Sequence, residues 1–170
     1  MPAAELRCLV SIRHVLIDAA VWVACGLVVG VTFARRDWRR LSTPGFFTTL
    51  RRFESDHFYE RRLFVRRWKE LLPEAGTWFG GISKRRLPRR VDGALQRFAA
   101  ESLRAERVHW TLLGVLPVVI LWSRGWLMAA NMVFGLIINV PCIVVARYKD
   151  RKSTRLNSSH IPLSRMPSSA

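Results

Sequence analysis

The chain has 170 residues, half of them hydrophobic, and it carries 28 Lys and Arg against 12 Asp and Glu, a formal net charge of +16. The charge is concentrated, because residues 35–107 hold 19 Lys and Arg against 9 Asp and Glu while the flanking apolar runs are nearly uncharged. This distribution disfavours nucleic-acid binding. It favours an all-α integral membrane protein with a basic cytoplasmic face.

Residues 1–14 form an N-terminal segment before the first apolar run, residues 15–34. At ~1.5 Å per residue this run reaches ~30 Å as a helix, the thickness of a bilayer core. A cleaved signal peptide is the alternative, but the run is long for one and arginines follow at once, as after a membrane anchor. Asp18 lies four residues after His14 on one helix face, and we expect this pair to reach the headgroups rather than to relay protons.

Residues 35–107 are predicted to be a basic cytoplasmic interfacial region. Residues 51–69 alternate basic pairs with hydrophobic side chains, a pattern that favours an interfacial helix over a buried core. Two motifs follow, WKELLPEAG at residues 68–76 and GGISKRR at residues 80–86. The glycine pair can free backbone amides to face a ligand. The basic cluster can hold phosphates of an acyl donor or contact anionic membrane lipid.

Residues 108–146 are predicted to form a transmembrane hairpin, with a turn at Ser123-Arg124-Gly125. Its first run, residues 108–122, spans only ~22 Å as a helix and contains Pro117, so partial entry into the bilayer is an alternative to crossing. The second run, residues 126–146, is long enough to cross. Tryptophans at both ends of the hairpin favour full crossing of both runs.

Three spans place residues 35–107 and the short segment 147–151 on one side of the membrane. The positive-inside rule makes that side cytoplasmic and the protein a multi-pass protein of the cell membrane. Residues 152–170 are Ser-rich and lack a helical or strand period. They are similar to a translated vector tail, and we predict that this segment is not native.

Candidate chemistry is concentrated at the start of the hairpin. The chain contains no phosphate loop, dinucleotide-binding turn, nucleophile elbow or zinc motif, so neither a metal nor a cofactor is predicted. Glu106 and His109 have a spacing that places them on one helix face, and a carboxylate beside a histidine suits general-base activation of a hydroxyl. The alternative is an interfacial histidine capped by its neighbours. Asn139 in the second run serves either helix packing or a substrate cavity.

The sequence around these residues resembles that of the glycosyl-4,4'-diaponeurosporenoate acyltransferase family. The resemblance rests on residues 68–76, 80–85, 101, 104–106, 109–110, 117, 121–122, 126, 139–141 and 147–148. It implies transfer of a fatty acyl group from a thioester donor, acyl-CoA or an acyl carrier protein, onto a sugar hydroxyl of a glycosylated carotenoid or related glycolipid. The alternatives are a non-catalytic membrane protein that scaffolds glycolipid or pigment enzymes, and an adaptor that binds anionic lipid.

The predicted site therefore combines a catalytic group with a binding group. The predicted catalytic residues are His109, Glu106 and Glu74. The predicted substrate- and donor-binding residues are Trp68, Lys69, Gly80, Gly81, Lys84, Arg85, Arg86 and Asn139.

Overall fold

The computed structural model describes residues 3–72, 94–121 and 123–158, and every regular element within them is a helix. The predicted all-α class is thus confirmed. In chain order the elements are α1 (Ala3–Ala34), α2 (Trp38–Leu41), η1 (Phe58–Arg62), α3 (Val65–Trp68), η2 (Lys69–Leu71), α4 (Ala94–Ile120) and α5 (Trp126–Ser158).

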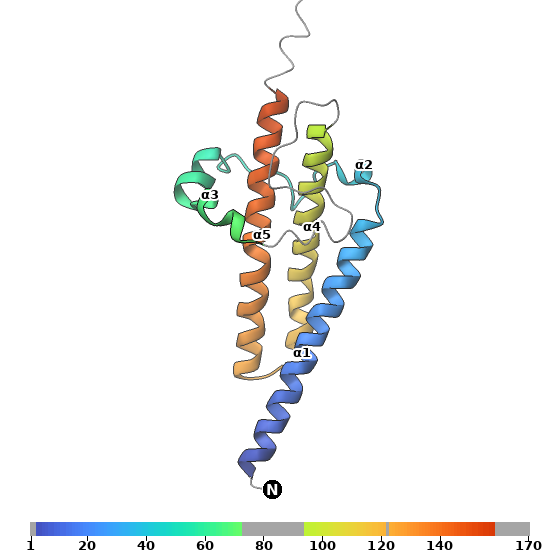
Figure 1. Cartoon of the computed structure of the whole chain (residues 1–170), viewed down its shortest axis with the longest axis vertical. Helices are drawn as coiled ribbons and strands as arrows, with labels where there is room; N and C mark the ends of the chain where they lie inside the picture. Colours follow the sequence, from blue (N-terminus) through green and yellow to red (C-terminus); the bar gives the residue numbers. More distant parts are fainter. Residues whose placement is uncertain (1–2, 73–93, 122, 159–170) are drawn as a thin grey trace, which may run out of the picture.

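The long helices α1, α4 and α5 dominate the described part of the chain (Figure 1). α4 and α5 pack against each other as an antiparallel hairpin, and α1 leans across α4. The predicted turn between the last two helices is present, and Gly125 has a φ of +60°, which a residue without a Cβ adopts at no steric cost. Close packing also involves Gly135 of α5, because a Cβ there would lie 2.9 Å from the Trp22 ring of α1 and overlap Leu116 of α4.

Two stretches, Ile12–Ala34 and Trp126–Arg155, are long and apolar enough to cross a membrane. Large apolar side chains such as Leu16, Val28 and Ile137 stand exposed on them, as expected of surfaces that face lipid. These features suggest a membrane protein. Residues 108–120 of the predicted third span form the apolar end of α4, which continues from the charged half without a break at residue 107.

Polar side chains lie inside the bundle. Asp18 is only 4% exposed, and its Oδ2 accepts hydrogen bonds from Asn131 Nδ2 at 2.6 Å and Ser123 Oγ at 3.2 Å. Trp22 Nε1 donates to Asn131 Oδ1 at 3.1 Å. The expectation that Asp18 reaches the headgroups is therefore wrong, because donors from the hairpin enclose its carboxylate. This cluster joins α1 to α5 and to the turn that precedes it.

The continuous interfacial helix predicted over residues 51–69 is also wrong. The segment forms short helical turns, interrupted where Phe64 adopts a left-handed φ of 50°. Tyr59 and Val65 are fully buried and pack with Val145 and Tyr148 of α5. The basic pairs remain exposed while these apolar side chains turn inward, so one segment carries both a charged surface and a small core.

The C-terminal helix extends further than the sequence pattern indicates. No helical period was found after residue 151, yet α5 continues to Ser158. Ser153 is buried and donates to Asp150 O at 2.8 Å, and the Lys152 ammonium lies 5.7 Å from the Tyr148 ring centroid. These contacts to the preceding turn stabilise the extension of α5 beyond residue 151. The non-native origin of residues 152–170 stays a prediction.

Replacing Asp18 with Ala should destabilise the protein by about 1–3 kcal/mol, because Asn131 and Ser123 then lose a buried acceptor. The measurement is thermal unfolding of the purified chain in detergent. Leu16→Ala, an exposed position on the same helix, is the control and should change stability far less. Additive losses in Asp18→Ala, Asn131→Ala and the double variant would contradict a direct coupling between α1 and α5.

Candidate functional site at the α4–α5 junction

Arg147 of α5 joins three parts of the chain. Its Nε donates to Glu106 Oε1 of α4 at 2.7 Å, its Nη1 pairs with Glu54 Oε1, and its Nη2 donates to Phe47 O. The guanidinium and both carboxylates are largely removed from solvent. A buried charge of this kind is tolerated only when it is paired and fully hydrogen-bonded, so Arg147 fixes the loop before η1 against both helices.

Glu54 is held from a second side. Its Oε1 also accepts from the Tyr59 hydroxyl at 3.0 Å, and its Oε2 accepts from the Arg51 backbone amide at 2.5 Å. Burial, followed by the negative charge of Glu54, raises the pKa of Tyr59 well above its ordinary value. Tyr59 therefore stays a neutral hydrogen-bond donor at physiological pH.

Glu106 is completely buried. Its Oε1 accepts from Trp110 Nε1 at 3.1 Å as well as from Arg147, while its Oε2 has no hydrogen-bond partner within the described part of the chain. Burial raises the pKa of the Glu106 carboxyl, and the hydrogen bond and charge of Arg147 oppose that shift. One carboxylate oxygen is thus structural and the other remains able to accept a hydrogen bond.

His109 of α4 faces Asn139 of α5, with 2.9 Å between His109 Nδ1 and Asn139 Oδ1. Asn139 is 1% exposed, and its Nδ2 donates to Gly135 O at 2.9 Å. Because Gly135 O can only accept, the amide group of Asn139 must turn its oxygen to the imidazole, and Nδ1 must carry the hydrogen. The neutral ring then has its lone pair on Nε2, the tautomer that a base requires.

The structure thus brings together three residues of the predicted site, His109, Glu106 and Asn139, on the facing helices α4 and α5. It differs from prediction in one respect, because the residue that orients Nδ1 of His109 is Asn139 rather than Glu106. The carboxylate of Glu106, one turn away, is turned to Arg147 and Trp110 instead.

Trp68 and Lys69 belong to a different part of the molecule. Trp68 Nε1 donates to Leu63 O at 2.8 Å and its ring packs on the small core around Tyr59, whereas Lys69 Nζ lies 3.2 Å from Glu70 Oε1. The remaining predicted residues lie outside the described residues: Glu74, Gly80, Gly81, Lys84, Arg85 and Arg86.

Sequence reasoning missed Glu54, Tyr59 and Arg147 as members of this cluster. The sequence places Arg147 only in the basic segment predicted to follow the last span and in the family motif. One usable signal was the excess of basic residues in 35–107, 19 Lys and Arg against 9 Asp and Glu, because an outnumbered acid that becomes buried can find a cationic partner. Within the described residues, no group of three or more His, Cys, Asp or Glu could hold a metal ion.

Comparisons with known proteins agree with the resemblance. The family model described as glycosyl-4,4'-diaponeurosporenoate acyltransferase matches residues 43–159, more than half of the chain. A relative of that name from Staphylococcus aureus strain N315 is 30% identical over 102 residues, covering 58% of this chain and 60% of the relative. A relative of the same name from strain bovine RF122 / ET3-1 is 29% identical with the same coverage.

The chain therefore spans about three fifths of the length of these curated relatives. No solved structure gives a match to it. The family match covers η1, the small core, α4 and α5, and includes Glu54, Glu106, His109, Asn139 and Arg147. The chain belongs to the glycosyl-4,4'-diaponeurosporenoate acyltransferase family.

Proposed function

We propose that this chain is a membrane acyltransferase that moves a fatty acyl group from a thioester donor onto a sugar hydroxyl of a glycosylated carotenoid or related glycolipid. The name of its relatives supports the reaction class and a glycosylated acceptor. The observation that carries the proposal is the contact between His109 Nδ1 and Asn139 Oδ1, which sets the tautomer of a base.

In this reaction His109 Nε2 takes the proton of the acceptor hydroxyl as its oxygen attacks the thioester carbonyl. The C–S bond breaks when the tetrahedral intermediate collapses, the ester remains on the sugar, and the imidazolium returns its proton to the leaving thiolate. Asn139 positions the ring throughout. The nearby carboxylate of Glu106 favours the imidazolium by its charge, and its unpartnered Oε2 can accept a hydrogen bond.

The position of His109 suits two substrates of opposite solubility. It lies where the charged half of α4 meets the apolar half that ends at Ile120. A water-soluble donor can approach from the basic side, and a lipid-soluble acceptor can approach from the apolar side. An adaptor without chemistry would not require a histidine held in one tautomer at this boundary.

His109→Ala should lower kcat by about 10²- to 10⁴-fold, the usual contribution of a positioned base, while membrane insertion is unchanged. The assay follows the mass of an acceptor glycolipid for an added acyl chain in membranes that contain the protein. His57→Ala is the matched control, since His57 is exposed and makes no side-chain cap at η1.

Glu106→Gln should lower kcat as well, and it should also lower the melting temperature, because Arg147 loses part of its buried counter-charge. Near-normal kcat in His109→Ala together with a loss in His57→Ala would transfer the role of base to His57. Pigment binding without turnover in the unaltered protein would favour a scaffolding protein.

Lys84→Ala and Arg85→Ala should raise the donor KM by about tenfold each and leave kcat nearly unchanged, because a charge contact present in both ground and transition states affects binding alone. This prediction follows from the GGISKRR motif at residues 80–86. Initial rates over a range of acyl-CoA concentrations measure it, with Arg62→Ala, at an exposed arginine of η1, as the control. A fall in kcat at constant KM would show that these residues act in the chemical step.

We further propose three membrane crossings with the N-terminus outside, since the charge of residues 35–107 opposes translocation. In a background without cysteine, Arg61→Cys should react with an impermeant maleimide only after the cells are opened. Arg124→Cys, at the exposed hairpin turn, should react in intact cells. Equal protection of both sites would show that residues 108–122 enter and leave the membrane on one side.

A further inference from the structure

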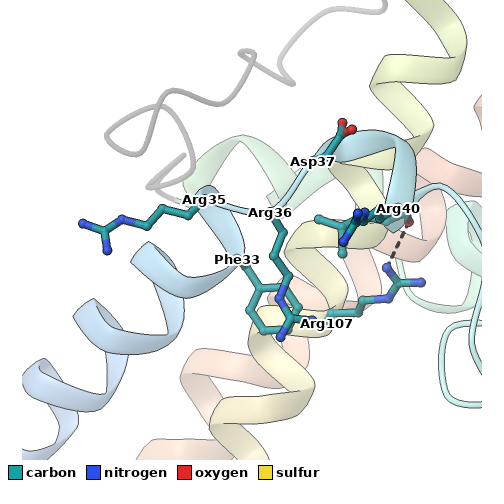
Figure 2. Close-up of a pocket in the computed structure, with 7 residues that line it drawn as sticks. Phe33, Arg35, Arg36, Asp37, Arg40 and Arg107 are labelled. Carbon is teal, nitrogen blue, oxygen red and sulfur yellow. Dashed lines mark hydrogen bonds between the residues drawn. The ribbon is translucent and has the colours of Figure 1, made fainter.

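A cavity of about 830 Å³ opens where the end of α1 meets α2 and α4 (Figure 2). Four arginines line it, Arg35, Arg36, Arg40 and Arg107, together with the apolar side chains of Phe33 and Leu41 and the acid Asp37. It therefore combines a strongly positive lining with an apolar wall. None of these residues belongs to the site around His109.

The single acid of the lining does not neutralise the arginines. Asp37 Oδ1 caps α2 by accepting from the Arg39 backbone amide at 3.0 Å. Arg107 donates to the backbone oxygens of Leu41, at 3.0 Å, and Thr43, so it keeps its full charge while it holds the wall in place. Among the described residues, no salt bridge joins any of the four lining arginines to a carboxylate.

All four arginines line the same cavity. Arg36 lies over the Phe33 ring, with 5.5 Å between the guanidinium carbon and the ring centroid, and this contact restrains its direction. Figure 2 shows Arg35 extending away from the other labelled side chains and Arg36 directed toward the Phe33 ring. Guanidinium groups pair with phosphate oxygens in a two-pronged geometry that an ammonium cannot reproduce.

The position of the cavity, at the end of an apolar stretch, further restricts the chemistry of its ligand. Phe33 and Leu41 flank the point where the apolar stretch Ile12–Ala34 ends, so the cavity lies at the boundary between apolar and polar surroundings. A ligand that fits has a phosphate for the arginines and an apolar part that can remain beside Phe33. Phospholipids and fatty acyl-CoA thioesters both have this chemistry.

We propose that this cavity is a phosphate-binding site for an amphipathic ligand. The phosphate comes from the headgroup of an anionic phospholipid or from an acyl-CoA donor. Only the second source rests on the proposed function, and binding can be tested without any turnover.

The test uses the full chain in nanodiscs of phosphatidylcholine. Calorimetric titration with palmitoyl-CoA measures the nucleotide-bearing source, and native mass spectrometry after addition of phosphatidylglycerol counts retained anionic lipid. The cavity variant is Arg36→Gln with Arg40→Gln, which leaves Arg107 to hold the loop. The matched control, Arg61→Gln with Arg62→Gln, removes the same charge from exposed positions of η1.

The cavity variant should weaken binding of one of the two ligands at least tenfold, while the control changes it less than about threefold. Arg36→Lys with Arg40→Lys keeps the charge and loses the planar fork, so it should give a partial loss and guards against a folding defect in the first variant. Loss confined to palmitoyl-CoA identifies the donor as the source, and loss confined to phosphatidylglycerol identifies the lipid. Equal losses in the cavity and control variants, or undiminished binding of both ligands in the cavity variant, would overturn the proposal.

Discussion

The paired charge of Arg147 is the interaction on which the polar half of this structure depends. A guanidinium buried between α4, α5 and the preceding loop costs several kcal/mol in desolvation unless carboxylates and carbonyls surround it. Glu54, Glu106 and the Phe47 carbonyl do so. Because these partners come from segments far apart in sequence, the loop, the small core around Tyr59 and the register of α4 on α5 are fixed together. That register is also what places His109 opposite Asn139.

The apolar half of the bundle is held together by a second set of buried polar contacts. Apolar side chains face outward on α1 and α5, and the polar side chains Asp18, Asn131 and Asn139 lie between the helices. In lipid, apolar contact alone gives helices little reason to associate, so hydrogen bonds and close packing at small residues specify the arrangement. Gly135 serves both purposes, because it admits Trp22 and Leu116 closely and its carbonyl holds Asn139. The packing of α1 is thereby linked to the orientation of His109.

Sequence was sufficient for features that depend on local pattern. The lengths of the apolar runs predicted a helix that ends at Ala34 and another that begins at Trp126. The turn at Gly125 was predicted because only three residues separate the last two apolar runs. Features that depend on distant partners were not accessible. The donors to Asp18 lie 105 and 113 residues away, and Arg147 meets Glu54 across 93 residues. Helical spacing predicted that His109 pairs with Glu106, but His109 Nδ1 instead contacts Asn139 on another helix.

Most acids of the described residues are engaged inside the structure, which leaves a basic surface on η1 and α3. The acids of the loop and α4 are engaged largely by the C-terminal part of α5: Arg147 takes Glu54 and Glu106, Tyr148 donates to Glu60 at 2.8 Å, and Arg155 pairs with Asp56 at 2.6 Å. The exposed pair with Asp56 adds little stability, whereas the buried pairs with Arg147 determine the fold. Within the described residues, no salt bridge joins Arg36 or Arg40 to any of these acids. With these acids held by α5, Arg36 and Arg40 keep their charge, as the proposed binding of an external phosphate in their cavity requires.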